Sequence, residues 1–290
     1  MVYYLSMNEM WLIVIVGFLG LVFGSFINAL VWRLSQVLDK NGDPKKLSAK
    51  KKKELSIVSA RSMCPSCKHQ LSAPDLVPVF SWLFLKGKCR YCKKPISAQY
   101  PLVELITAGL FALSAYAWNF DQTWMVASFI TWLICLVGLV ALAVYDAKTM
   151  LLPDKIIFKL YLVAIAGLII EFLLGRPPAD ILQIAGSVFV SGGIFYILYQ
   201  VSQGKWLGGG DVKLGLLIGL LLPNALQGAL MLFLASILGT ITSIFLSVNK
   251  KIERSTKIAF GPFLIASTII VVLYGQSIID WYLNIIVYGV

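Results

Sequence analysis

Residues 123–145 read TWMVASFITWLICLVGLVALAVY, a stretch without a charged side chain that ends beside Asp146. About 20 mostly apolar residues are enough for a helix to cross the hydrocarbon core of a membrane. The whole chain shares this character, because 59% of its 290 residues are hydrophobic and only 13% are charged, whereas soluble domains have roughly 45–50% and 25%. The composition therefore excludes a water-soluble globular protein.

Seven further segments have a similar apolar character, so we predict an all-α integral membrane protein with about eight transmembrane helices. The predicted spans are residues 10–32, 102–118, 123–145, 156–174, 180–201, 212–223, 224–248 and 258–275. The sixth is shorter than a typical span. The first lacks the basic n-region and the cleavage site of a signal peptide, so we interpret it as a retained span.

One segment carries the whole net charge of +11. Residues 33–94 contain 15 Lys and Arg but only 4 Asp and Glu. Lys and Arg accumulate in cytoplasmic loops, and with the N-terminus outside, 23 of the 25 basic residues fall in cytoplasmic loops, including the cluster at 250–257. We therefore predict three parts, which are a first span (1–32), a basic cytoplasmic insertion (33–101) and a polytopic membrane domain (102–290).

The first part of the insertion, residues 39–60, is rich in lysine. Such a charge run is typical of a solvated, partly helical arm, and attraction to anionic lipid headgroups is the alternative. No aromatic residues alternate with the lysines as in a nucleic-acid stacking platform, so we expect contact with membrane lipid but no nucleic-acid partner.

The second part of the insertion contains two Cys-x-x-Cys pairs separated by 21 residues, namely Cys64, Cys67, Cys89 and Cys92. This spacing is typical of a four-thiolate structural zinc site. A redox motif or disulfides are the alternatives, and a cytoplasmic location disfavours stable disulfides. His69, the only histidine, is expected to be solvated, and Cys135 to be a buried apolar residue. The membrane segments have no histidine, which excludes a Ser-His-Asp triad and an H-E-x-x-H protease there.

Carboxylates at the cytoplasmic ends of the predicted spans are the candidate catalytic groups, because ionisable side chains at membrane depth are costly. Asp211 follows three glycines, where positive φ angles would allow close approach of a substrate, although it could equally be a helix N-cap. Asp146 ends another span on the same side. Two close carboxyl groups share a proton, which is the arrangement of an aspartic protease. Asp154 is a rival partner, but its sequence resembles a helix start with Asp154 as the cap.

These motifs together resemble the bacterial type IV prepilin peptidases, which are G-x-G-D membrane aspartic proteases. The resemblance rests on GSFINALVWRL (24–34), the two cysteine pairs with SWLFLKGKC between them, ISAQYPLVEL (96–105), the D-x6-P-D segment (146–154), GGGD (208–211) and AFGPFL (259–264). It implies catalysis by Asp146 and Asp211 and zinc binding by the four cysteines. The residues that it implies as support for the active site are Gly208, Gly210, Lys213, Gly261 and Pro262.

The resemblance further implies a leader peptidase at the cytoplasmic face of the bacterial inner membrane. Its substrates would be type IV prepilins and the pilin-like proteins of type II secretion. Many members also methylate the new N-terminus with S-adenosylmethionine, usually those with the cysteine module. Leu76-Val77-Pro78 departs from the common Asn-Ile-Pro. The alternatives are a peptidase with a purely structural zinc module and an ion-coupled transporter.

Overall fold

The computed structural model describes residues 7–39, 42–57, 60–248 and 258–288, so the basic cluster predicted at 250–257 lies outside it. The described residues form helices, with isolated β-bridges but no strands. The chain divides into two compact units, Met1–Ala117 and Trp118–Val290, which we call the first and the second unit. The predicted division at 32 and 101 remains a prediction.

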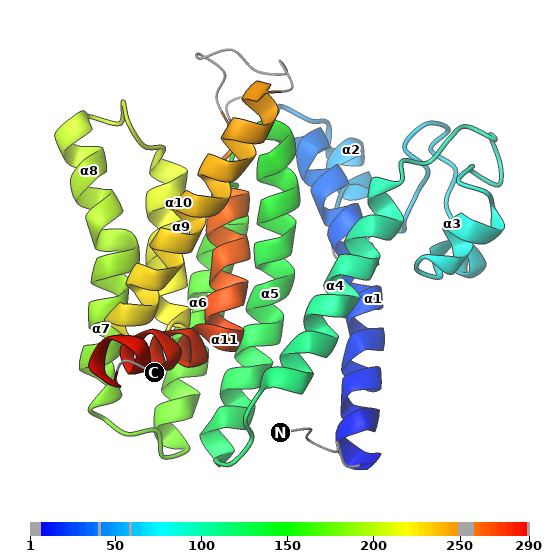
Figure 1. The fold of residues 1–290 in the computed structure, drawn as a ribbon. Helices are drawn as coiled ribbons and strands as arrows, with labels where there is room; N and C mark the ends of the chain where they lie inside the picture. The colour runs from blue at the N-terminus through cyan, green and yellow to red at the C-terminus, as the bar shows by residue number, and fades with distance from the viewer. Residues whose placement is uncertain (1–6, 40–41, 58–59, 249–257, 289–290) are drawn as a thin grey trace. The chain divides into compact units, whose positions relative to one another are not determined.

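In the first unit, α1 (Met7–Val37) packs lengthwise against α4 (Gln99–Ala117) (Figure 1). Glycines permit this close approach, because a Cβ added at Gly24 would lie 2.6 Å from the Cα of Glu104. The Asn28 side chain donates a hydrogen bond to the Tyr100 carbonyl (2.9 Å). The helix α1 is longer than the predicted span, and Arg33 near its C-terminal end contacts the insertion.

The insertion has little regular structure. Its elements are α2 (Ala49–Glu54), the 3-10 helix η1 (Ala73–Leu76) and α3 (Phe80–Phe84). The four lysines at 50–53 are exposed on α2, in agreement with a solvated, partly helical arm. Arg33 ties the insertion to α1 by donating to the carbonyl oxygens of Ser56 (2.7 Å) and Ala60 (2.8 Å).

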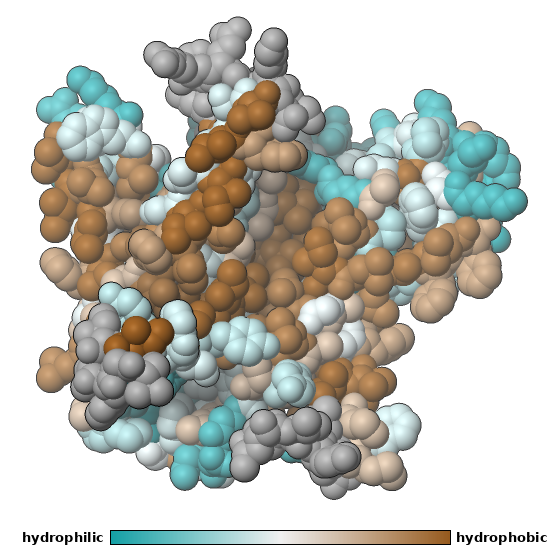
Figure 2. Space-filling model, viewed as in Figure 1, coloured by the Kyte–Doolittle hydropathy of each residue, from teal (hydrophilic) through white to brown (hydrophobic). Residues whose placement is uncertain are grey.

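The second unit is a helical bundle. Its elements are α5 (Thr123–Thr149), α6 (Asp154–Leu173), α7 (Asp180–Val188), the π-helical turn η2 (Phe189–Gly193), α8 (Ile194–Ser202), α9 (Gly209–Leu221), α10 (Ala225–Val248) and α11 (Gly261–Tyr288). The flanks of α8 and α10 are covered by hydrophobic side chains (Figure 2), as expected for surfaces that face lipid. The last helix continues well past the predicted end at residue 275.

Seven helices among the described residues are long and apolar enough to cross a membrane, so the predicted count of eight is approximate. The difference is α9, which has only 13 residues. Protein surrounds it, since a Cβ added at Gly215 would lie 2.4 Å from the Ser191 carbonyl oxygen and one at Gly219 would lie 2.4 Å from the Val188 Cα. Burial against α7 and η2 explains how so short a helix is accommodated within the bundle.

A buried ionic cluster joins the end of α6 to the start of α7. The Arg176 side chain is 9% exposed and pairs with Glu171, and its Nε lies 3.1 Å from Asp180 Oδ2. The guanidinium also lies 5.3 Å from the centre of the Trp124 ring. Glu171 is therefore an internal ion-pair partner.

Candidate active site and metal centre

The predicted pair Asp146 and Asp211 comes together at one end of the second unit. Asp146 lies near the end of α5 and is 4% exposed, and Asp211 lies in the first turn of α9. The two carboxyl groups are close enough to interact electrostatically. The backbone of Gly261, the first residue of α11, hydrogen-bonds to Asp146. Three helices thus bring two carboxyl groups to one place, the arrangement needed for shared-proton chemistry.

Asp211 is not the N-cap of its helix. The N-cap is Gly208, and its backbone hydrogen-bonds to the Asp211 carboxyl group, as in the backbone half of a capping box. Gly208 has a φ of −74°, and none of residues 208–210 is among the described glycines with positive φ. The predicted use of left-handed backbone is therefore wrong. The absence of a side chain at Gly208 leaves room for the Asp211 carboxyl group, because an added Cβ would lie 3.3 Å from Asp211 Oδ2.

Leu152 is a part of the site that sequence reasoning missed. A Cβ added at Gly210 would lie 3.2 Å from the Leu152 Cβ, and one at Gly261 would lie 3.5 Å from its Cδ2. The leucine thus fits between the first turns of α9 and α11. Its only signal in the sequence was its position between Asp146 and Pro153, which we interpreted as a simple helix start.

Asp154 and Lys213 pair with each other beside the site. The Lys213 ammonium lies 2.8 Å from both carboxylate oxygens of Asp154. Asp154 is the first residue of α6, whose N-cap is Pro153, so its predicted role as a cap is wrong. The pair is half-exposed and contributes little stability, but it links the start of α6 to α9.

Pro262, the second residue of α11, suits a helix start, where its missing N–H costs nothing.

The four cysteines of the two Cys-x-x-Cys pairs form a single cluster in the first unit. Their sulfur atoms all lie within 4.8 Å of one another, and the Sγ atoms of Cys64 and Cys92 are 4.0 Å apart. Sulfur ligands at about 2.3 Å around a tetrahedral zinc are about 3.8 Å apart. The cluster can therefore hold a metal ion. His69 is exposed, outside the cluster, and its ring centre lies 3.7 Å from that of Tyr91.

The two cysteine pairs lie on matching turns. Lys68 donates its backbone N–H to the Cys64 carbonyl (2.9 Å), and Lys93 donates to the Cys89 carbonyl (3.0 Å). Both lysines have a φ of 58°. An isolated antiparallel bridge closes each turn, Met63 with Gln70 and Lys88 with Pro95. Two copies of one turn present two thiols each, as zinc knuckles do.

Hydrogen bonds to Cys89 favour its thiolate form. Burial alone would raise the pKa of the Cys89 thiol, but hydrogen bonds from the backbone of Cys92 and Tyr91 and from neighbouring thiols lower it to about 7. Metal ligands must be deprotonated, so the lowered pKa of Cys89 favours metal binding at neutral pH, whereas burial raises the pKa of the Cys64 thiol to about 11. Cys135 is fully buried in α5, in agreement with its predicted role as a small apolar residue.

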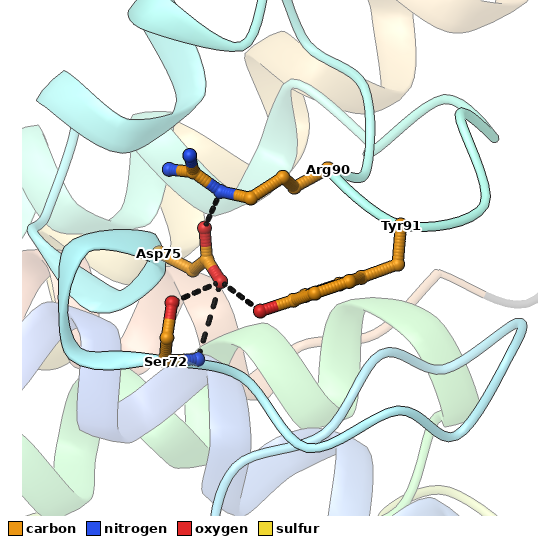
Figure 3. A network of polar contacts seen from close by, with 4 residues as sticks. All are labelled: Ser72, Asp75, Arg90 and Tyr91. Carbon is orange, nitrogen blue, oxygen red and sulfur yellow. Dashed lines mark hydrogen bonds and ion pairs between the residues drawn. The ribbon is translucent and has the colours of Figure 1, made fainter.

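Asp75 joins the second cysteine turn to η1 (Figure 3). Its carboxylate accepts hydrogen bonds from the Ser72 hydroxyl (2.7 Å), the Arg90 Nε (2.6 Å) and the Tyr91 hydroxyl (3.1 Å). Burial alone would raise the pKa of Asp75, but these hydrogen bonds lower it to about 2. The ionised carboxylate therefore stabilises the segment around the cysteines.

Replacing Asp75 by Asn is expected to destabilise the cysteine segment by about 1.5–3 kcal/mol, because hydrogen bonds to a charged group are lost. Hydrogen exchange of residues 62–96 in the full chain measures this local stability. A lowered pKa stabilises the fold above the ordinary carboxyl value of about 3.9. The difference should therefore stay constant from about pH 8 to 5 and decline only as the pH falls toward 2. The exposed Asp43→Asn is the matched control, and equal exchange in both variants would contradict the prediction.

Comparison with known proteins identifies the family. Residues 18–118 match the model of the bacterial peptidase A24 N-terminal domain, and residues 133–244 match that of the type IV leader peptidase family. A prepilin leader peptidase/N-methyltransferase of Aeromonas salmonicida is 33% identical over 95% of this chain and 96% of its own length. The chain belongs to the type IV leader peptidase family.

Other relatives support this assignment along the whole chain. Proteins of the same name from Pseudomonas aeruginosa and Aeromonas hydrophila are 32% and 34% identical, over 97% and 94% of this chain and 97% and 95% of their own lengths. No solved structure matches. The N-terminal family match includes the cysteine cluster, and the peptidase match includes Asp146 and Asp211, so both parts of the predicted chemistry lie within family-specific sequence.

Proposed function

We propose that this member of the type IV leader peptidase family is a membrane aspartic endopeptidase that removes the short basic leader from type IV prepilins and pilin-like secretion proteins. The observation that carries the proposal is the meeting of Asp146 and Asp211, from helices far apart in the sequence, beside the start of α11. No histidine is available in the membrane segments, and a carboxyl pair needs none.

The two carboxyl groups share one proton in the proposed mechanism. The ionised aspartate takes a proton from a water molecule as the oxygen attacks the carbonyl carbon of the scissile peptide bond, while the protonated aspartate donates to the carbonyl oxygen. The C–N bond then breaks, and the leaving amine receives a proton from the pair. A coupled pair titrates as a unit, so both residues are essential and neither has a fixed role as acid or base.

The excess of Lys and Arg in the loops supports an active site on the cytoplasmic side of the bacterial inner membrane. The basic leader of the substrate would stay at this face while its apolar helix enters from the bilayer. The Lys-rich arm at 39–60 would contact anionic lipid headgroups. In this proposal residues 1–32 and 33–101 precede a catalytic membrane domain at 102–290.

The cysteine cluster is proposed to hold one structural zinc ion. The matching turns and the short sulfur–sulfur distances fit a tetrahedral four-thiolate site, which stabilises a segment too small to build its own core. We further propose that the protein methylates the new N-terminal amine, as the names of its relatives state for them. S-adenosylmethionine would supply the methyl group.

One experiment tests both activities. Purified protein is incubated with a prepilin and isotope-labelled S-adenosylmethionine, and the pilin is analysed by mass spectrometry. Cleavage after the leader together with one labelled methyl group on the new N-terminus is the expected result. Cleavage without label would support the peptidase-only alternative, and an uncut prepilin would contradict the proposed function.

Gly261→Ala is expected to lower cleavage by about 100-fold, because a misplacement of a catalytic group by about 1 Å can cost that much. The added Cβ would lie 2.5 Å from Asp146 Oδ2 and push the carboxyl group away. Initial rates of prepilin cleavage measure the effect. Gly239→Ala is the matched control, since its Cβ would meet nothing closer than 3.5 Å. Equal cleavage rates for both variants would show that the close contact of Gly261 with Asp146 is not needed for catalysis.

A further inference from the structure

The first unit contains a cavity that the proposed peptidase mechanism does not use. Its volume is about 340 Å³, within the range of roughly 300–1,000 Å³ typical of small-molecule sites. It lies between the ends of α1 and α4 and the segment that carries the cysteines, since its walls include Asn28, Trp32, Trp82, Tyr100 and Glu104. All of these residues belong to one compact unit.

An acceptor without a partner lies in the cavity wall. The Asn28 side chain is 4% exposed, and its Oδ1 has no hydrogen-bond partner among the residues that the structure describes. Its Nδ2 donates to the Tyr100 carbonyl, which fixes the orientation of the amide. A buried acceptor left unpaired costs about 1–3 kcal/mol. A ligand that donates a hydrogen bond, or that carries positive charge, would remove this cost.

A buried carboxyl group also lines the cavity. Glu104 is 6% exposed, although it lies on α4 among apolar residues. Its Oε2 accepts the backbone N–H of Val79 (2.7 Å). Val79 has a φ of 62°, a strained conformation for a β-branched residue, and this bond helps to hold it. The carboxyl group thus connects α4 with the wall formed by α3 and adds a further acceptor to the cavity.

Two of the three basic side chains in the wall are engaged within the protein, and the third, Lys94, is exposed. The Arg33 guanidinium donates to the carbonyl oxygens of Ser56 and Ala60, and Arg90 is paired with Asp75. The buried part of the wall therefore offers the unpaired Asn28 acceptor and the Glu104 carboxyl group, which suit a cationic or hydrogen-bond-donating ligand better than an anionic one such as a lipid phosphate.

Aromatic rings complete the site. Trp32, Trp82 and Tyr100 line the cavity, and the Trp82 ring is fixed by a hydrogen bond from its Nε1 to the Ile96 carbonyl (3.1 Å). Aromatic faces bind flat heterocycles by stacking and attract cations such as ammonium or sulfonium groups. A ligand with both a heterocycle and a positive charge matches this set of groups.

We propose that this cavity is the binding site for S-adenosylmethionine, an inference that rests on the proposed methyltransferase function. The ligand combines an adenine ring with a sulfonium and an ammonium group. The aromatic rings receive the adenine, while the Asn28 Oδ1 and the Glu104 carboxylate face the positive charge. The cysteine cluster has a positioning role, because Cys64 and Cys89 form part of the same wall.

The test compares direct binding with cleavage in the full-length protein. Ala29 lines the cavity from α1, so Ala29→Phe fills the space without removing a polar contact. We expect it to weaken S-adenosylmethionine binding, measured by isothermal titration calorimetry, at least tenfold, and to leave prepilin cleavage unchanged. Asn28→Leu removes the unpaired acceptor and should weaken binding about tenfold. Leu105→Phe, on the exposed side of α4, is the matched control and should bind like the wild type.

The charge of the ligand provides a second measurement. S-adenosylhomocysteine lacks the positive sulfonium, so Glu104→Gln should weaken binding of S-adenosylmethionine more than binding of S-adenosylhomocysteine. Unchanged binding by Ala29→Phe and Asn28→Leu in protein that still cleaves prepilin would place the site elsewhere and leave the methyltransferase function intact. A wild-type protein that cleaves prepilin but neither binds S-adenosylmethionine nor transfers its methyl group would overturn both proposals.

Discussion

Replacing Asp146 or Asp211 by Asn is expected to reduce prepilin cleavage at least about 1,000-fold, because an amide can neither take a proton from water nor give one to the substrate, and such proton transfers contribute roughly 100- to 10,000-fold. The protein should remain folded, since Asn has almost the same volume as Asp and removes a buried carboxyl group from apolar surroundings. Cleavage is measured by mass spectrometry of the prepilin, and folding by size-exclusion chromatography in detergent. The double variant should be no slower than either single variant, because the two groups act as a unit.

The Asp154→Asn variant tests whether Asp154, which lies at the same end of the bundle, is a catalytic residue in place of Asp146 or Asp211. Asp154 is half-exposed and paired with Lys213, so its replacement removes the same charge without touching the proposed catalytic pair. Cleavage should stay within a few-fold of the wild type. Robust cleavage by Asp146→Asn or Asp211→Asn, or a loss in Asp154→Asn as large as theirs, would reject the proposed assignment.

Replacing Cys64 and Cys67 by Ser is expected to lower the zinc content from about one ion per chain to none. Two ligands of four are lost, and structural zinc sites bind with apparent free energies of about 10–16 kcal/mol. Residues 62–96 should then lose their protection from hydrogen exchange, because both turns depend on the shared ion. Metal analysis of the purified protein gives the stoichiometry.

Cys135→Ala is the matched control for the zinc experiment. It removes a thiol that is fully buried in α5, in the other unit, and should leave the zinc content unchanged. Wild-type protein that is free of metal yet active, with four reactive thiols, would show that the cluster is not a zinc site.

Apolar runs predicted most of the helices, because a segment must be long and apolar to cross a bilayer whatever its neighbours are. The same rule failed for α9, which packs through Gly215 and Gly219 against other helices. It also could not show which side of a span faces lipid, because both sides are apolar. The close contact of α1 with α4 at Gly24 was therefore not predicted.

The sequence by itself determined the membrane class, the basic insertion and the two cysteine pairs, because composition and short spacings are local properties that every conformation of the chain retains. It also singled out Asp146 and Asp211 as rare carboxylates beside apolar helices. Only the tertiary structure decided that Leu152 completes their surroundings, that the Gly261 backbone contacts Asp146, that Asp154 pairs with Lys213, and that Asn28 and Glu104 line one cavity. These contacts depend on how distant helices pack, and packing is set by side chains that meet only in the folded protein.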